Sequence, residues 1–262
     1  MSRTFHTAAC LLIAITLTPL SAASQTAERS RTEGLKETER FVKAGGTTSQ
    51  AVAAAKLQVS KTLDSYNALV TQPSKNMKGD YKKLMSSMDD MNTKAAEAGK
   101  TVAAMQATGD TYFTGRAGTI KEIKDPALQG QAQERLTGSQ KELAGVLEAL
   151  RESRDALEPF RKELADQITY LGSDLTPSAT ASLKTKAEKL NADGAEVFAK
   201  TDAAITKSNT YFQGLRAQSS NSGPHVVSAF RRTSRSPAEA GHYERQRNGS
   251  RSRLSRSRPV DR

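Results

Sequence analysis

Apolar residues recur at alternating steps of three and four along much of this chain, the pattern of a helix that buries one narrow strip of its surface. The first such series runs without a break from Tyr81 to Tyr112. Its members are Tyr81, Leu84, Met88, Met91, Ala95, Ala98, Val102, Met105, Gly109 and Tyr112. These steps form the a/d seam of a coiled coil, and the small residues in its middle allow a partner helix to approach closely.

Three further series follow the same spacing. One is all leucine, and it consists of Leu136, Leu143, Leu150, Leu157, Leu164 and Leu171. Another consists of Leu183, Ala187, Leu190, Gly194, Val197, Thr201, Ala204, Ser208, Tyr211 and Leu215, with Phe198, Ile205 and Phe212 widening the face. A shorter one near the start consists of Val52, Val59, Leu63, Tyr66 and Val70. The chain therefore predicts helices that meet along apolar strips.

Glycine and proline mark where these helices break. Gly45-Gly46 interrupts the first stretch, and residues 73–79 form a turn. Asp125-Pro126 and Thr176-Pro177 each place a capping side chain before a proline at the first helical position. The predicted helices span 28–71, 79–123, 126–172 and 177–217. Short connections make sequential helices antiparallel, so we expect an all-α fold, an elongated antiparallel helical bundle or coiled coil of three to four long helices.

Pro159 lies inside the third predicted helix, where a proline removes one backbone hydrogen bond. Since the leucine series continues past it, we expect a bend in the helix rather than its end.

The N-terminus has the features of an export signal. Arg3 precedes an apolar run over 8–20, and residues 21–23 are small. We expect a signal peptide over 1–23 and an exported protein of the periplasm or cell envelope. Retention of the run as an anchor is the alternative, although the run is shorter than the ~20 residues needed to span a bilayer. No later stretch is long and apolar enough to cross a membrane.

The helical region over 24–217 lacks the side chains that most often carry catalysis. The single cysteine, Cys10, lies in the predicted signal peptide, and the two later histidines are His225 and His242. The thiol nucleophile, the commonest general base and the commonest transition-metal ligands are thus missing from this region. We expect no enzymatic activity, no cofactor and no metal.

The net charge of +11 is unevenly spread. Residues 218–262 hold ten arginines, no lysine and three acidic residues, whereas 24–217 has a net charge of only +3. Such an Arg/Ser-rich segment cannot bury enough apolar surface to fold, so we expect a disordered tail over 218–262. It is either an anion-binding arm or the product of a frameshift or read-through. The candidate anion-binding residues are Arg231, Arg232, Arg235, Arg251, Arg253, Arg256 and Arg258.

Part of the third and fourth predicted helices resembles a known family. The matching residues are Leu157-Glu158-Pro159, Asp166-Gln167-Ile168-Thr169-Tyr170-Leu171, Leu175 and Ala179-Thr180-Ala181-Ser182-Leu183. They resemble the DUF2959 family, exported bacterial proteins of unknown function, and the resemblance covers roughly 27–217. It implies an export signal, a helical coiled coil and a bent third helix. Relatives often carry a lipoprotein cysteine after the apolar run, whereas Cys10 here comes near its start. The resemblance also implies a contact surface formed by Glu158, Asp166, Gln167 and Tyr170.

Together these patterns predict a non-enzymatic structural or protein-interaction protein of the cell envelope, which binds another protein or self-associates. The alternative is a module that binds an anionic polymer or a membrane surface through its Arg-rich tail. Nucleic acid is then a candidate ligand for the tail and not for the mildly basic helical region.

Overall fold

The computed structural model describes residues 21–221 of the chain and the side chains of 32–220. Within that range every regular element is a helix, as predicted. The elements are α1 (Ser21–Thr71), α2 (Met77–Lys121), α3 (Pro126–Ser173), α4 (Pro177–Ser182) and α5 (Lys184–Asn221). The predicted signal peptide, apart from its last three residues, and the chain beyond 221 lie outside the described residues.

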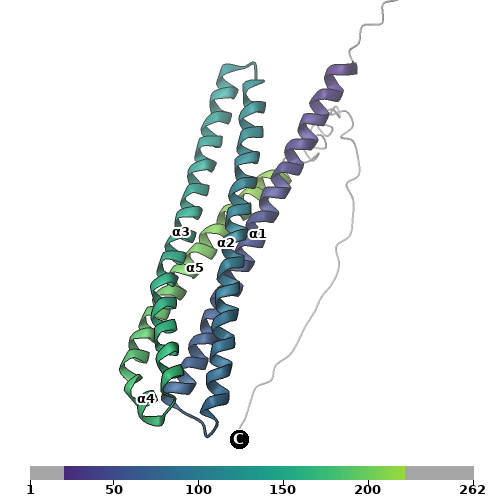
Figure 1. Ribbon diagram of the computed structural model, residues 1–262. Helices are drawn as coiled ribbons and strands as arrows, with labels where there is room; N and C mark the ends of the chain where they lie inside the picture. The colour runs from purple at the N-terminus through teal and green to yellow at the C-terminus, as the bar shows by residue number, and fades with distance from the viewer. Residues whose placement is uncertain (1–20, 222–262) are drawn as a thin grey trace, which may run out of the picture. The chain divides into compact units, whose positions relative to one another are not determined.

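The long helices form an antiparallel four-helix bundle. Both α1 and α3 pack against α2 and α5, and neighbouring helices run in opposite directions (Figure 1). Hydrogen bonds fix the register between α1 and α5, because Ser49 bonds Ser208 at 3.0 Å and Asn67 bonds Asn191 at 2.7 Å. The α1–α2 turn and α4 lie at one end of the bundle, and the α2–α3 turn lies at the other.

Side chains cap the helices where the sequence predicts. The Asp125 carboxylate accepts hydrogen bonds from the backbone N–H groups of Ala127 and Leu128, at 2.8 and 3.2 Å. The Thr176 hydroxyl accepts one from Ala179 at 3.2 Å. Each cap satisfies N–H groups that have no partner inside the helix, and so fixes where α3 and α4 begin.

The predicted helix over 177–217 is wrong in one respect, because it is divided at Leu183. The N–H of Leu183 bonds the carbonyl of Thr180 at 3.1 Å, which closes α4 with a tight turn. Its carbonyl accepts from Ala187 at 2.8 Å, in the first turn of α5. The Leu183 side chain is buried. One helix therefore ends and the next begins around Leu183, and the buried seam continues through this residue.

The predicted helix over 28–71 is confirmed, and the interruption expected at Gly45-Gly46 does not occur, because α1 passes through both glycines. Gly45 faces the bundle, and a Cβ atom there would overlap the ring of Phe212. The close approach of this ring stabilises a helical glycine that costs ~1 kcal/mol relative to alanine. The seam of α1 accordingly extends further toward the N-terminus than predicted. Its additional buried members are Thr38, Phe41, Val42, Thr48 and Ser49.

The predicted seams are otherwise confirmed. All ten predicted seam residues from Leu183 to Leu215 are buried, nine of them on α5, and those of α2 are buried except for the half-buried Tyr81, Ala95 and Val102. On α3 the leucines are buried apart from Leu157, which is half-buried. A second strip of α3, which the leucine series does not include, completes the core. It consists of Val146, Ser153, Phe160 and Gln167. As expected, α3 continues through Pro159.

The buried side chains form two separate clusters, one toward each end of the bundle. The aromatic-end core, near the α2–α3 turn, consists of Phe41, Val42, Val52, Ala55, Ala98, Met105, Tyr112, Phe113, Ile120, Leu136, Leu143, Val146, Leu150, Ala204, Tyr211, Phe212 and Leu215. The aliphatic-end core, near α4, consists of Val59, Leu63, Tyr66, Leu69, Val70, Leu84, Met88, Met91, Phe160, Leu164, Ile168, Leu171, Leu183, Ala187, Leu190 and Val197.

Candidate contact surface

Three of the four predicted contact residues lie on the outside of α3, and the fourth does not. Glu158, Asp166 and Tyr170 are exposed, whereas Gln167 is only 2% exposed. The inclusion of Gln167 in a contact surface is therefore wrong, because its side chain points into the aliphatic-end core.

Gln167 joins a chain of hydrogen bonds across that core. The Tyr66 hydroxyl on α1 donates to Gln167 Oε1, and Gln167 Nε2 donates to Glu163 Oε1 at 2.9 Å. Burial, and secondly the charge of Glu163, raises the pKa of the Tyr66 phenol well above its usual range, so Tyr66 keeps its proton and donates. Gln167 follows Phe160 by seven residues and Ser153 by fourteen. A second heptad series through Ser153, Phe160 and Gln167 predicts that Gln167 is buried.

Asp166 and Tyr170 lie together near the end of α3. They are four residues apart, so they share one face of the helix. The Tyr170 side chain is 42% exposed, and its hydroxyl lies 3.4 Å from the Ser182 hydroxyl of α4. The adjacent Ile168 and Leu171 are buried in the core and hold this turn of α3 in place. The result is an aromatic ring and a carboxylate presented on a fixed backbone, and we call Asp166 and Tyr170 the Tyr170 surface.

Glu158 is not part of the Tyr170 surface. It lies eight residues before Asp166, which is about 12 Å along the helix. Its carboxylate pairs with Arg161 at 2.8 Å, and Arg161 also donates to Asn92 Oδ1 of α2 at 3.4 Å. Glu158 is therefore paired within α3, and the contact with α2 is made by Arg161.

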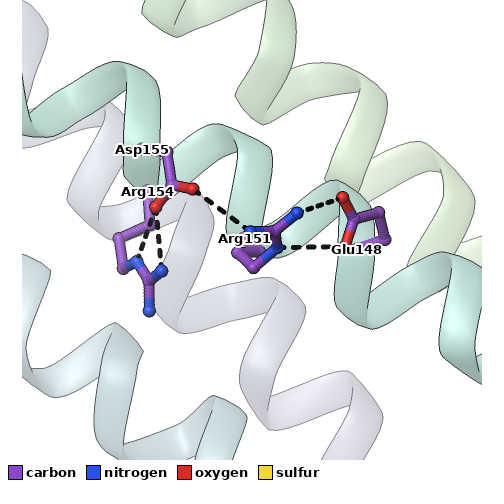
Figure 2. A network of polar contacts seen from close by, with 4 residues as sticks. All are labelled: Glu148, Arg151, Arg154 and Asp155. Carbon is purple, nitrogen blue, oxygen red and sulfur yellow. Dashed lines mark hydrogen bonds and ion pairs between the residues drawn. The ribbon is translucent and has the colours of Figure 1, made fainter.

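A further run of charges lies on the exposed face of α3 (Figure 2). Arg151 bonds Glu148 at 2.6 Å and lies 3.8 Å from Asp155, which also pairs with Arg154 at 2.8 Å. The hydrogen bond from Arg151 lowers the pKa of Glu148. These side chains are about half exposed, and such pairs contribute little to stability. The run is a solvated helix face whose charges already satisfy one another.

A polar groove of about 420 Å³ lies between α3 and α5. Four acidic side chains line it, together with Lys189 and Lys200. Each lysine is already paired, Lys189 with Asp193 at 2.6 Å and Lys200 with Glu196 at 2.7 Å. Across residues 32–220 no cluster of His, Cys, Asp and Glu side chains has the arrangement of a metal site. Both lysines of the groove are therefore already paired with acidic residues of their own helix.

Two other predictions concern membrane-spanning segments and the C-terminal arginines. Each helix between 21 and 221 is too short or too polar to cross a bilayer. The candidate anion-binding arginines, from Arg231 to Arg258, all lie outside the described residues, and their role stays a prediction.

Comparison with known protein families identifies a match to most of the described helices. The model of a family described as a protein of unknown function (DUF2959) matches residues 27–215. No curated protein and no solved structure matches the chain. The matched range covers most of α1, all of α2, α3 and α4, and α5 as far as the last residue of its seam.

Proposed function

The chain belongs to the DUF2959 family of proteins of unknown function, and from this premise we propose that it is a non-enzymatic protein of the cell envelope that acts by binding another protein. The bundle is the scaffold, and the Tyr170 surface makes the contact.

The exposure of Tyr170 is the observation that carries this proposal. Leu35, Leu57, Met85, Leu128 and Tyr170 are the exposed large hydrophobic side chains among residues 32–220. Tyr170 alone of these is aromatic, and aromatic residues dominate binding energy at protein interfaces. Its hydroxyl end is polar while its ring is apolar, so it suits a surface that is wet when free and dry when bound.

The chemistry of the Tyr170 surface indicates the kind of partner. The ring needs an apolar recess, and the Asp166 carboxylate, one turn earlier, favours a cationic side chain beside that recess. We therefore propose a partner with a shallow apolar pocket flanked by lysine or arginine.

The proposed location rests on the N-terminal sequence. The apolar run over 8–20, followed by small residues at 21–23, supports export. A helical fold without an apolar span between 21 and 221 is compatible with a protein delivered to the envelope.

Site-specific photo-crosslinking in the native host tests the contact. A benzophenone amino acid placed at position 170 should give a discrete cross-linked product, and the added substitution Asp166→Lys should remove it. The matched control is the same probe at Leu128, which is 55% exposed and lies at the other end of α3. Equal products at both positions, or a product at 170 that survives Asp166→Lys, would contradict the proposal.

The charge of the C-terminal segment favours a second proposal, that the chain binds anionic polymers. The ten arginines of 218–262 give that segment a net charge of +7. Binding to heparin should weaken steeply with salt, because phosphate- or sulfate-bound counterions are released. A chain ending at Asn221, where α5 ends, should lose this binding. Undiminished heparin binding by the shortened chain would contradict the proposal.

A further inference from the structure

The two buried clusters of the bundle meet at a narrow junction. Every long helix passes from one core to the other through a stretch without a large fully buried side chain, although Leu157 on α3 and Phe198 on α5 are half-buried there. On α1 this gap is a single seam step, from Ala55 to Val59. The longer gaps lie between Met91 and Ala98 on α2, between Leu150 and Phe160 on α3, and between Val197 and Ala204 on α5. The buried residues that bound the gaps on the aromatic side are mostly alanines.

A polar pair occupies the junction. Ser153 Oγ on α3 and Thr201 Oγ1 on α5 lie 2.7 Å apart, and both side chains are buried. The pair satisfies its own hydrogen bonds, so burying it carries no large penalty. It nevertheless buries little apolar area. Each methylene group that an apolar pair would bury here contributes ~0.8 kcal/mol, and the two cores lack that stabilisation. The coupling between the cores is therefore weak compared with the packing inside each.

Both helices that carry the pair have, close to it, a feature that favours bending. Pro159 has no N–H group, so the Asp155 carbonyl lacks its helical donor. On α5 the Thr201 hydroxyl donates to the Val197 carbonyl at 2.7 Å, a contact that often bends helices. The polar groove between α3 and α5 lies beside these points, lined by Asp155, Pro159 and Lys200 among others.

The connections between helices make the two ends unequal. The α1–α2 turn and the α3–α4–α5 connection both lie at the aliphatic end, whereas the aromatic end has only the α2–α3 turn. Helix α1 begins and α5 ends toward the aromatic end, so these segments can separate from the α2–α3 hairpin without disturbing any connection.

From these features we propose that the Ser153–Thr201 junction, together with Pro159, is a hinge, and that the bundle opens in two steps. The aromatic end opens first by separation of the N-terminal part of α1 and the C-terminal part of α5 from the α2–α3 hairpin. The aliphatic end stays folded during this step. The exposed ion pair between Lys56 and Asp202, at 2.6 Å, is the surface link between α1 and α5 near the hinge.

Native-state hydrogen exchange of the full chain at increasing denaturant tests the hinge. Backbone amides around Phe41, Tyr112 and Tyr211 should share one opening reaction, and those around Tyr66 and Leu164 should share another. The protection factors of the aromatic-end amides should be lower than those of the aliphatic-end amides by about tenfold or more, because their opening leaves the other core intact. A single opening reaction for both groups, with the same protection and denaturant dependence, would overturn the proposal.

Variants of the junction test which residues form the hinge. Ser153→Ala with Thr201→Val replaces the polar pair by apolar groups and, combined with Pro159→Ala, should bring the two protection levels together. The matched control is Ser49→Ala with Ser208→Ala, which removes a buried hydroxyl pair of α1 and α5 away from the junction. This control should lower aromatic-end protection and leave two separate levels. If the junction variant kept the wild-type difference in protection between the two ends, the junction residues would not form the hinge.

Discussion

The two ends of the bundle are built from different side chains around the same four helices. At the aromatic end Phe41 is in contact with four other rings, with centroids 5.0 Å from Phe212, 5.2 Å from Tyr112, 6.0 Å from Phe113 and 6.2 Å from Tyr211. At the aliphatic end leucine, valine and methionine surround Tyr66, whose hydroxyl bonds Gln167. One core depends on the fit of a few large rings, and the other on many flexible aliphatic side chains packed around a hydrogen-bonded tyrosine.

This difference has an energetic meaning. Rings that fill fixed spaces leave large cavities when removed, whereas aliphatic side chains can shift to fill part of a gap. A buried hydrogen-bonded pair tolerates the removal of both partners better than the removal of one. The four predictions below test this contrast, beginning with the largest effect.

Removing the central ring should cause the largest loss. Phe41→Ala should lower the free energy of unfolding by ~3–5 kcal/mol, because four neighbouring rings then face a cavity. Urea denaturation followed by circular dichroism measures the change. Leu35→Ala is the control on the same helix, since Leu35 is 43% exposed, and it should change stability by less than ~0.5 kcal/mol. Comparable losses from the two substitutions would contradict the central role of Phe41.

The adjacent glycines of α1 should respond in opposite directions. Gly45→Ala should destabilise by ~1–3 kcal/mol, because the new methyl group overlaps the Phe212 ring. Gly46→Ala should stabilise by ~0.5–1 kcal/mol, since a Cβ there meets nothing within 4 Å and alanine favours the helix. Melting temperatures of the two variants give the comparison. Stabilisation by both would show that Phe212 moves aside freely.

At the aliphatic end the buried hydrogen bond should show non-additivity. Tyr66→Phe should cost ~1–3 kcal/mol, because the buried carbonyl of Gln167 loses its donor. Adding Gln167→Leu should recover part of that loss. A double-mutant cycle by urea denaturation measures the coupling between the two positions. If the two losses were additive, the hydrogen bond between Tyr66 and Gln167 would contribute no coupling energy.

The smallest effect should appear at alkaline pH. Burial raises the pKa of Tyr211 to about 12, whereas a tyrosine in the unfolded chain ionises near its model value of 10.0. The unfolded state therefore releases its proton first, so this contribution to stability is present below pH ~10 and is lost as the pH rises toward 12. The melting temperature should fall over that range, and Tyr211→Phe should reduce the slope. Tyr66→Phe should do so as well, since the pKa of Tyr66 is also raised. An unchanged slope in both variants would assign the alkaline loss to other groups.

The sequence predicts the fold because the spacing of apolar residues along each helix also determines which face of that helix packs against its neighbours. All ten seam residues from Leu183 to Leu215 can be identified, because a heptad series leaves little choice of buried face. The series of α3 was incomplete because its second strip includes Ser153 and Gln167, whose polarity hides them from a hydrophobic pattern. A glycine pair disfavours a helix by propensity, so Gly45-Gly46 suggests an interruption, and only the position of Phe212 shows why residue 45 must be glycine inside α1.

The contact surface was harder to predict than the fold. The resemblance indicated a segment of α3, but whether a polar side chain in that segment points outward depends on the helix opposite. Gln167 faces Tyr66 of α1, a residue far away in the chain, whereas Asp166 one position earlier faces solvent. A single step along a helix turns a side chain by about 100°, so burial can change completely between neighbours.

The direction of the helices determines how the molecule would be presented on a solid support. Residues 21 and 221 both lie toward the aromatic end, and Tyr170 lies at the opposite end beside α4. The 38 residues of α5 span about 57 Å between these ends. A protein shortened to residues 21–221 and immobilised through residue 21 or 221 would therefore display Tyr170 away from the support, accessible to the proposed partner.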